Sequence, residues 1–190
     1  MVVKPDNGVG ANNTYKLQSD EDVQWFIHTK DPAVYIMEEF VNGYVQTFDG
    51  IVDSQGNMLF ESGNISPISI MDIVNNNDDS VYYLVKDLPE KIRQAGLATV
   101  KAFGVRSRFI HLEFFVLNED QEGLGKKGDV LGLEVNMRPC GGFTPEMYNY
   151  SQETDVYKIW ADMVAFDRNT KPIGKHHYCA FYGRRDGRHY

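Results

Sequence analysis

The residues most suited to chemistry are three polar side chains that alternate along one short stretch. Glu134, Asn136 and Arg138 occupy every second position, and the positions between them are apolar: Leu133, Val135 and Met137. Successive side chains of a β-strand point to opposite faces, so this alternation predicts a strand with one packing face and one polar face. The polar face would carry a carboxylate, an amide and a guanidinium in a row. A solvated surface strand is the plain alternative.

A second predicted strand makes the chemical interpretation stronger. Residues 108–115 place His111 and Glu113 on one face, and the polar, glycine-rich segment 118–129 that follows is typical of a hairpin connection. An antiparallel pair would bring Glu113 beside Glu134 and Asn136. Facing carboxylates repel each other, and a divalent cation between them reverses this. Two carboxylates and an amide oxygen suit Mg²⁺ better than Zn²⁺, and Arg138 is suited to binding a phosphate.

Composition limits the classes of protein that need to be considered. The chain has 190 residues, of which 42% are hydrophobic, and this is enough for one sizeable core or one domain with a smaller lobe. Its net charge of −8 disfavours a nucleic-acid-binding protein. The two cysteines form no disulfide framework, and no apolar run reaches membrane-spanning length, so we expect a cytoplasmic protein.

The pattern along the chain predicts strands alternating with a few helices. The expected strands cover residues 1–4, 33–37, 44–52, 57–62, 81–85, 108–115, 133–138 and 175–182. The expected helices cover residues 19–30, with Ser19 to Asp22 as a capping box, then 89–103 and 155–166, with a short helical turn at Thr144. Residues 33–37 are expected to be buried, Pro89 to be the first helical residue, and Val164 to face inward. His176 and His177 are adjacent on a predicted strand, which favours structural roles over a metal site.

The segment 6–13 contains two glycines and three asparagines. Such a loop favours turns with exposed backbone N–H groups, which are able to bind phosphate oxygens. It lacks the lysine and hydroxyl residue of a P-loop and does not have the dinucleotide-binding spacing of glycines. An ordinary turn is therefore the alternative, and Lys4 just before the loop favours a phosphate site.

These elements, in this order, resemble the ATP-grasp superfamily, and are similar to biotin carboxylase and to the ATP-grasp domains of the carbamoyl-phosphate synthase large chain. The matching stretches are Val2 to Pro5 with Gly8 and Gly10, Glu38 to Val41 with Gly43, His111 to Phe115, and Leu133 to Pro139 with Gly141 and Gly142. The resemblance implies an α+β fold of the ATP-grasp type. An antiparallel β-sheet flanked by helices is expected, together with a partial small lobe.

The resemblance also implies residue roles. Lys4 would contact the α- and β-phosphates of ATP, and the loop at Gly8 and Gly10 would close over them. Glu38 would accept a hydrogen bond from the adenine amino group. The backbone of Glu39 and Val41 would meet the base, and Phe40 would line its pocket. The remaining roles belong to the two polar strands: Glu113, Glu134 and Asn136 would hold one or two Mg²⁺ or Mn²⁺ ions, and Arg138 would steady the transferring phosphoryl group. No residue is assigned to the ribose.

The resemblance implies an ATP- and Mg²⁺-dependent ligase that activates a carboxylate as an acylphosphate for attack by an amine or another nucleophile. The alternative is a non-catalytic ATP-binding or regulatory module of the same fold; a metal-dependent hydrolase is a weaker third. Residues 1–42 would be the second half of the small lobe, ending at the adenine hinge, and residues 43–190 the large catalytic lobe. We expect a fragment that lacks the N-terminal part and is inactive alone. The substrates and the oligomeric state, including a homo-oligomer, stay open.

Overall fold

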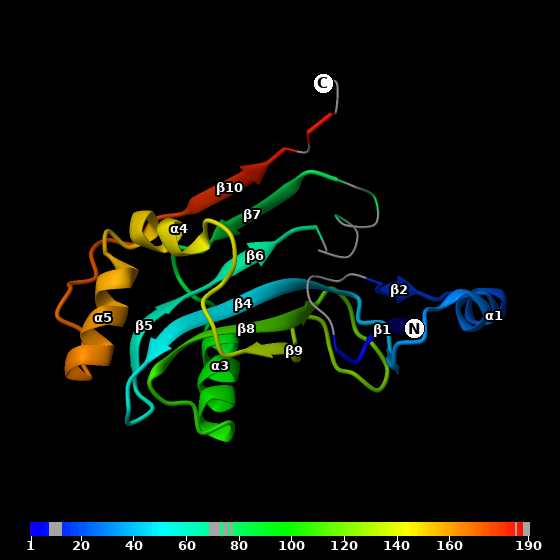
Figure 1. The fold of residues 1–190 in the computed structure, drawn as a ribbon, viewed down its shortest axis with the longest axis horizontal. Helices are drawn as coiled ribbons and strands as arrows, with labels where there is room; N and C mark the ends of the chain where they lie inside the picture. Colours follow the sequence, from blue (N-terminus) through cyan, green and yellow to red (C-terminus); the bar gives the residue numbers. More distant parts are fainter. Residues whose placement is uncertain (8–12, 69–72, 74–75, 77, 185, 188–190) are drawn as a thin grey trace.

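The computed structural model of the chain describes residues 1–7, 13–68, 73, 76, 78–184 and 186–187. The described elements form two antiparallel sheets, one of three strands and one of seven. The small sheet and helix α1 lie at one end of the molecule, and helices α4 and α5 lie at the other (Figure 1). None of the described helices is long and apolar enough to cross a membrane.

The small sheet has the order β2-β1-β3. Its strands are β1 (Val2–Pro5), β2 (Tyr15–Lys16) and β3 (Tyr35–Glu38), and α1 (Asp20–Thr29) lies between β2 and β3 in the chain. The predicted capping box is confirmed, because the Ser19 hydroxyl accepts from the backbone N–H of Asp22 and the Asp22 carboxylate accepts from that of Ser19. A small core of buried Val3, Leu17 and Phe26 joins the helix to the sheet.

The expectation of a buried strand over residues 33–37 is wrong. Three of the four residues of β3 are exposed, because α1 covers only part of this narrow sheet. The apolar side of α1 is also thinner than its sequence indicates: Phe26 is buried, but Trp25 and Ile27 are more than half exposed. Hydrophobic residues in these two elements therefore do not all belong to a core.

The large sheet has the order β10-β7-β6-β4-β8-β9, and β5 pairs with the second half of β4. Its strands are β4 (Gly43–Val52), β5 (Met58–Ser62), β6 (Asn64–Ser66), β7 (Ser80–Leu84), β8 (Arg108–Leu117), β9 (Val130–Asn136) and β10 (Cys179–Gly183). The central pair, β4 and β8, is antiparallel over its full ten residues. The expected hairpin around residues 53–56 is present, since β4 pairs with β5.

Helices pack on both faces of the large sheet, so each face has its own core. Helix α3 (Glu90–Ala102) covers one face, where its Ile92 and Val100 pack with Phe48 of β4. Helices α4 (Thr144–Ser151) and α5 (Val156–Phe166) pack at one end of the other face against Ile51 and Phe109. The part of this second face that α4 and α5 leave uncovered carries the polar residues of interest.

Several predicted boundaries differ by a few residues. Pro89 is the N-cap of α3 and not its first residue, and β10 begins at Cys179. Strand β9 ends at Asn136, so Arg138 lies just beyond it, where Pro139 prevents continued pairing. Val164, expected to face inward, is 66% exposed because α5 packs through Val156, Ile159 and Met163.

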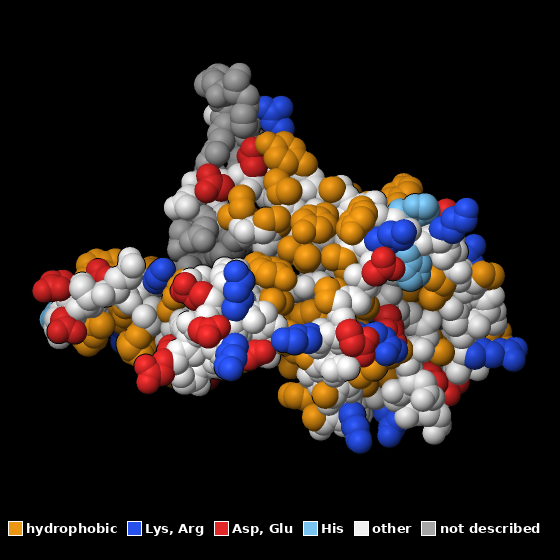
Figure 2. All heavy atoms as spheres, turned by 180° about the vertical axis from the view of Figure 1, so that it is seen from behind, with side chains coloured by type: hydrophobic (Ala, Val, Ile, Leu, Met, Phe, Trp, Pro, Cys, Tyr) orange, Lys and Arg blue, Asp and Glu red, His pale blue; other side chains and the backbone are white. Residues whose placement is uncertain are grey.

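The molecule seen from behind has hydrophobic side chains gathered over its middle, with lysines, arginines and acidic residues around them (Figure 2). Contiguous apolar surface of this kind usually marks a region of contact with another protein surface or segment.

Candidate functional site

The two predicted polar strands are neighbours in the expected register. Glu113 of β8 lies directly opposite Glu134 of β9, and His111 lies opposite Asn136. Residues directly opposite each other in an antiparallel pair project to the same face. The structure therefore brings Glu113, Glu134 and Asn136 together on one face of the sheet, the face away from α3.

A β-bulge in β9 adjusts this register. The pairing shifts after Glu113, so Phe114 lies opposite Gly132 and Leu133 is the extra residue. Beyond the bulge, Phe115 of β8 lies opposite Leu131 of β9. The same face therefore carries a polar row and, next to it, an apolar pair.

Glu113 accepts a hydrogen bond from a buried network of side chains on β4 and β8. His111 donates from Nε2 to Glu113 Oε1 at 3.0 Å and from Nδ1 to Asp49 Oδ1 at 2.6 Å. Thr47 Oγ1 donates to the other oxygen of Asp49. Asp49 is 1% exposed and His111 6%. The side chains of β4 and β8 thus form one connected network that ends at the half-buried Glu113.

The electrostatics of this network favour its charged forms. Burial opposes the charge of His111, but hydrogen bonds with Asp49, Cys140 and Glu113 outweigh it and raise the pKa of His111 to about 12. Burial also opposes ionisation of Glu113, but His111, Glu134 and the charge of Arg138 together lower the pKa of Glu113. Cationic His111 and ionised Glu113 therefore stabilise each other.

Asp49, His111 and Cys140 also place possible metal-ligand atoms within 4.8 Å of one another. Both nitrogens of His111 already donate to carboxylates, so the ring has no free lone pair for a metal. This trio is better described as an ion pair with a neighbouring thiol than as a metal centre.

The residues fit a magnesium ion better at the open end of the network. Glu134 is exposed, Glu113 is half-buried, and Asn136 adds an amide whose Nδ2 is buried with no hydrogen-bond partner in the described part of the chain. Oxygen ligands of this kind suit Mg²⁺. The carboxylates of Glu113 and Glu134 lie opposite each other, with Arg138 close by. A cation bound between these two carboxylates would lower their mutual repulsion.

The predicted hinge, residues 38–41, is held by the loop between β8 and β9. Gln121 donates from Nε2 to the Phe40 carbonyl at 2.6 Å and accepts from the Asn42 N–H at 2.9 Å. Phe40 and Asn42 alternate with Glu39 and Val41, the residues whose backbone the resemblance assigns to the base. The ammonium of Lys16 lies 3.7 Å from the centre of the Phe40 ring.

The structure pairs two residues that were predicted to contact different parts of the nucleotide. Lys4 Nζ lies 2.5 Å from Glu38 Oε2. The phosphate role of Lys4 and the adenine role of Glu38 therefore require this pair to separate. Gly8 and Gly10, expected to close over the phosphates, lie outside the described residues.

Sequence reasoning missed several residues of the site. Asp49 is a buried carboxylate on a strand whose other residues are uncharged, and this was a signal that it has a buried partner. Phe115 and Leu131 continue the site face by strand alternation. The partner of His111 could not be found from its own strand, since Asp49 lies 62 positions earlier in the chain.

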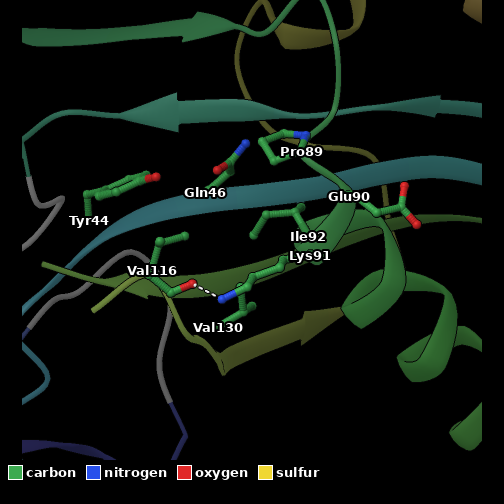
Figure 3. Close-up of a pocket in the computed structure, with 9 residues that line it drawn as sticks. Tyr44, Gln46, Pro89, Glu90, Lys91, Ile92, Val116 and Val130 are labelled. Carbon is green, nitrogen blue, oxygen red and sulfur yellow. Dashed lines mark hydrogen bonds between the residues drawn. The ribbon is translucent and has the colours of Figure 1, made fainter. Parts of the chain in front are cut away.

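A cavity of about 240 Å³ lies on the other face of the large sheet, between the start of α3 and strands β4, β8 and β9. Its lining includes Tyr44, Gln46, Ile92, Val116 and Val130, as Figure 3 shows. These positions on β4 and β8 alternate with those of the polar row. The cavity is therefore separated from Glu113 by the thickness of the sheet.

No protein-family model matches the sequence, and no curated protein matches it significantly. Solved structures do match. The biotin carboxylase domain of 2-oxoglutarate carboxylase from Hydrogenobacter thermophilus, in a complex with MgADP and bicarbonate, has a TM-score of 0.67 at 16% identity and covers 94% of this chain and 40% of its own. L-amino acid ligase from Bacillus licheniformis has a TM-score of 0.64 at 19% identity, over 86% of this chain and 38% of its own.

A third match is phosphoribosylglycinamide synthetase from Anaerococcus prevotii, with a TM-score of 0.59 at 18% identity, over 94% of this chain and 44% of its own. All three are ATP-grasp ligases. The predicted fold class is confirmed: the chain has an α+β fold that matches part of the ATP-grasp fold. It spans about 40% of the length of these structures.

Proposed function

We propose that this chain carries the metal-binding and phosphoryl-transfer face of an ATP-dependent ligase, which activates a carboxylate as an acylphosphate for attack by an amine or another nucleophile. The main observation that supports this proposal is the pairing of Glu113 with Glu134, with Asn136 on the same face and Arg138 beside them. This arrangement lies within a fold shared with ATP-grasp ligases.

Each residue has a definite task in this proposal. Glu113, Glu134 and Asn136 would hold Mg²⁺, which when bound neutralises charge on the phosphates of ATP. Arg138 would bind and orient the transferring phosphoryl group, whose oxygens carry the developing charge. Phe115 and Leu131 would form an apolar floor for the base, and residues 38–41 would meet its edge. Phosphoryl transfer needs this positioning more than it needs a protein nucleophile.

A non-catalytic nucleotide-binding module is the second candidate. The ion pair of Lys4 with Glu38 does not distinguish the two candidates, because ATP binding in either requires the pair to separate. The two candidates share the metal site but differ in turnover. A module that only binds ATP has little need for Arg138 beside Glu113. We propose that residues 1–42 belong to the small lobe and residues 43–190 to the large lobe in either case.

The test is ADP release from Mg·ATP with a panel of carboxylates and amines, measured for this chain and for the whole translated protein that contains it. A ligase releases ADP only when a suitable carboxylate is present. Glu134→Gln should abolish that release, while the matched variant Glu122→Gln, in the exposed loop between β8 and β9, should keep it. Tight ATP binding with no ADP from any substrate would support the module. Equal turnover by Glu134→Gln would remove Glu134 from the site.

Lys4→Ala separates the phosphate role from the ion pair. If Lys4 leaves Glu38 to contact phosphates, Lys4→Ala should raise the dissociation constant for ATP, as measured by calorimetry. An unchanged dissociation constant would assign Lys4 to the ion pair alone.

A further inference from the structure

The two carboxylate oxygens of Glu113 are not equivalent. Oε1 accepts a hydrogen bond from His111 Nε2 at 3.0 Å, which leaves Oε2 as the oxygen without this bond. His111 also donates from Nδ1 to Asp49 at 2.6 Å. Glu113 is therefore held at one of its oxygens by a ring nitrogen that lies within hydrogen-bonding distance.

His111 has no freedom to turn away from Glu113. Its side chain is 7% exposed, and the side chain of its partner Asp49 is 1% exposed. Asp49 is held in turn by the Thr47 hydroxyl. Tyr148 is fully buried near Asp49. Burial, and after it the negative charge of Asp49, raise the pKa of the Tyr148 hydroxyl. Turning the ring would leave a buried carboxylate unpaired, which is costly.

We propose that His111 is a positioning residue that limits Glu113 to one metal-facing oxygen and thereby makes the site favour Mg²⁺ over Ca²⁺. This inference rests on the proposed function, because it requires Glu113 to be a metal ligand. Ca²⁺ accepts carboxylates through both oxygens and takes six to eight ligands, whereas Mg²⁺ needs strict octahedral geometry and is usually held by one or two carboxylates. A carboxylate with one oxygen already occupied therefore suits Mg²⁺ better than Ca²⁺.

The alternation of the strands makes this restriction specific to Glu113. Glu134 lies on the outer strand β9 and is exposed, and its opposite neighbour is Glu113 itself. Asn136 lies opposite His111 and offers a single carbonyl oxygen. Removing His111 therefore changes the number of oxygens available at one ligand while leaving the other two in place.

Metal binding without nucleotide turnover provides the test. Mn²⁺ binding to this chain is followed by electron paramagnetic resonance, and Mg²⁺ and Ca²⁺ are titrated as competitors. In His111→Leu, the ratio of the Ca²⁺ to the Mg²⁺ dissociation constant should fall about tenfold, the size usual for loss of a group that orients a metal ligand. The matched control His28→Leu, on exposed α1, should keep the wild-type ratio. The double variant Asp49→Asn with His111→Leu removes both buried charges and serves if the single variant does not fold.

Nitrogen-15 magnetic resonance of the histidine rings tests the geometry without any metal. The His111 ring should carry a hydrogen on Nε2, in the wild type and in Glu134→Gln. An Nε2 without hydrogen would overturn the inference, because Glu113 would then have both oxygens available.

The outcomes separate this inference from the proposed function. Loss of Mn²⁺ binding in Glu134→Gln with an unchanged Ca²⁺ to Mg²⁺ ratio in His111→Leu would overturn the role of His111 and leave the metal site standing. Absence of Mn²⁺ binding, or binding that Glu134→Gln does not weaken, would overturn the metal site and this inference with it.

Discussion

The ion pair between Asp49 and His111 should be a large contributor to the cooperative stability of the site, and Asp49→Asn measures it. The substitution keeps the shape of the side chain and removes its charge, leaving cationic His111 with Glu113 as its only carboxylate partner. The two partners are almost completely buried and 2.6 Å apart. Breaking a buried pair by removing one partner costs about 3 to 5 kcal/mol. We expect about 3 kcal/mol here, since the amide that replaces the carboxylate still offers an acceptor oxygen.

Urea unfolding of the wild type, of both single variants and of the double variant Asp49→Asn with His111→Leu gives the coupling directly. The double variant removes both charges, so its cost should fall short of the sum of the single costs by at least about 2 kcal/mol. For a chain of this length, about 3 kcal/mol corresponds to a lowering of Tm by about 6 to 12 °C. A cost below about 1 kcal/mol for Asp49→Asn is the value for a surface pair. That result, or additive single costs, would refute the description of Asp49 and His111 as a buried ion pair.

Two further predictions concern the elements that carry the site. Gly96→Ala in α3 should destabilise the fold by about 1 to 2 kcal/mol in urea unfolding, because its Cβ would lie 2.3 Å from ring atoms of buried Phe48, a clash larger than the gain in helix propensity. Gly132→Ala has open space and should be close to neutral, and equal stabilities of the two variants would contradict this packing. Asp53→Asn should reduce the loss of stability on acidification. Burial opposes ionisation of Asp53, but hydrogen bonds from the side chain and N–H of Asn57 and from other N–H groups of the turn outweigh it and lower the pKa of Asp53. The stabilisation by ionised Asp53 is therefore fully present above the pKa of about 3.9 in the unfolded chain, and is lost as the pH falls through the lower pKa of the folded state. If the free energy of unfolding changes with pH equally in the wild type and in Asp53→Asn between pH 5 and 3, this prediction is wrong.

The sequence predicts the pairing of β8 with β9 well because both strands carry a two-residue alternation and a glycine-rich connection. Their facing carboxylates, Glu113 and Glu134, follow from the register alone. The capping box at Ser19 is likewise a local pattern. Local patterns of this kind need no knowledge of what lies across the sheet.

The remaining features depend on partners far apart in the chain. Asp49 and His111 meet because β4 and β8 are neighbours over ten residues, and no local pattern specifies that pairing. The exposure of Val164 depends on which side of α5 meets the sheet, and the exposure of β3 on how little of the small sheet α1 covers. Apolar periodicity gives the direction of a side chain but not whether another element is present to bury it.

The bulge at Leu133 has a consequence for how this region tolerates changes in length. Insertions or deletions in the loop of residues 118–129 leave the pairing of Glu113 with Glu134 unchanged, provided that Gln121 still reaches the hinge. Loss of the single residue Leu133 would remove the bulge and leave a regular ladder, in which Gly132 and Glu134, then adjacent, still lie opposite Phe114 and Glu113. Loss of Val135, beyond the bulge, would instead bring Asn136 opposite Leu112 and turn its side chain to the α3 face. The bulge and the adjoining loop should therefore tolerate changes of length that the end of β9 does not.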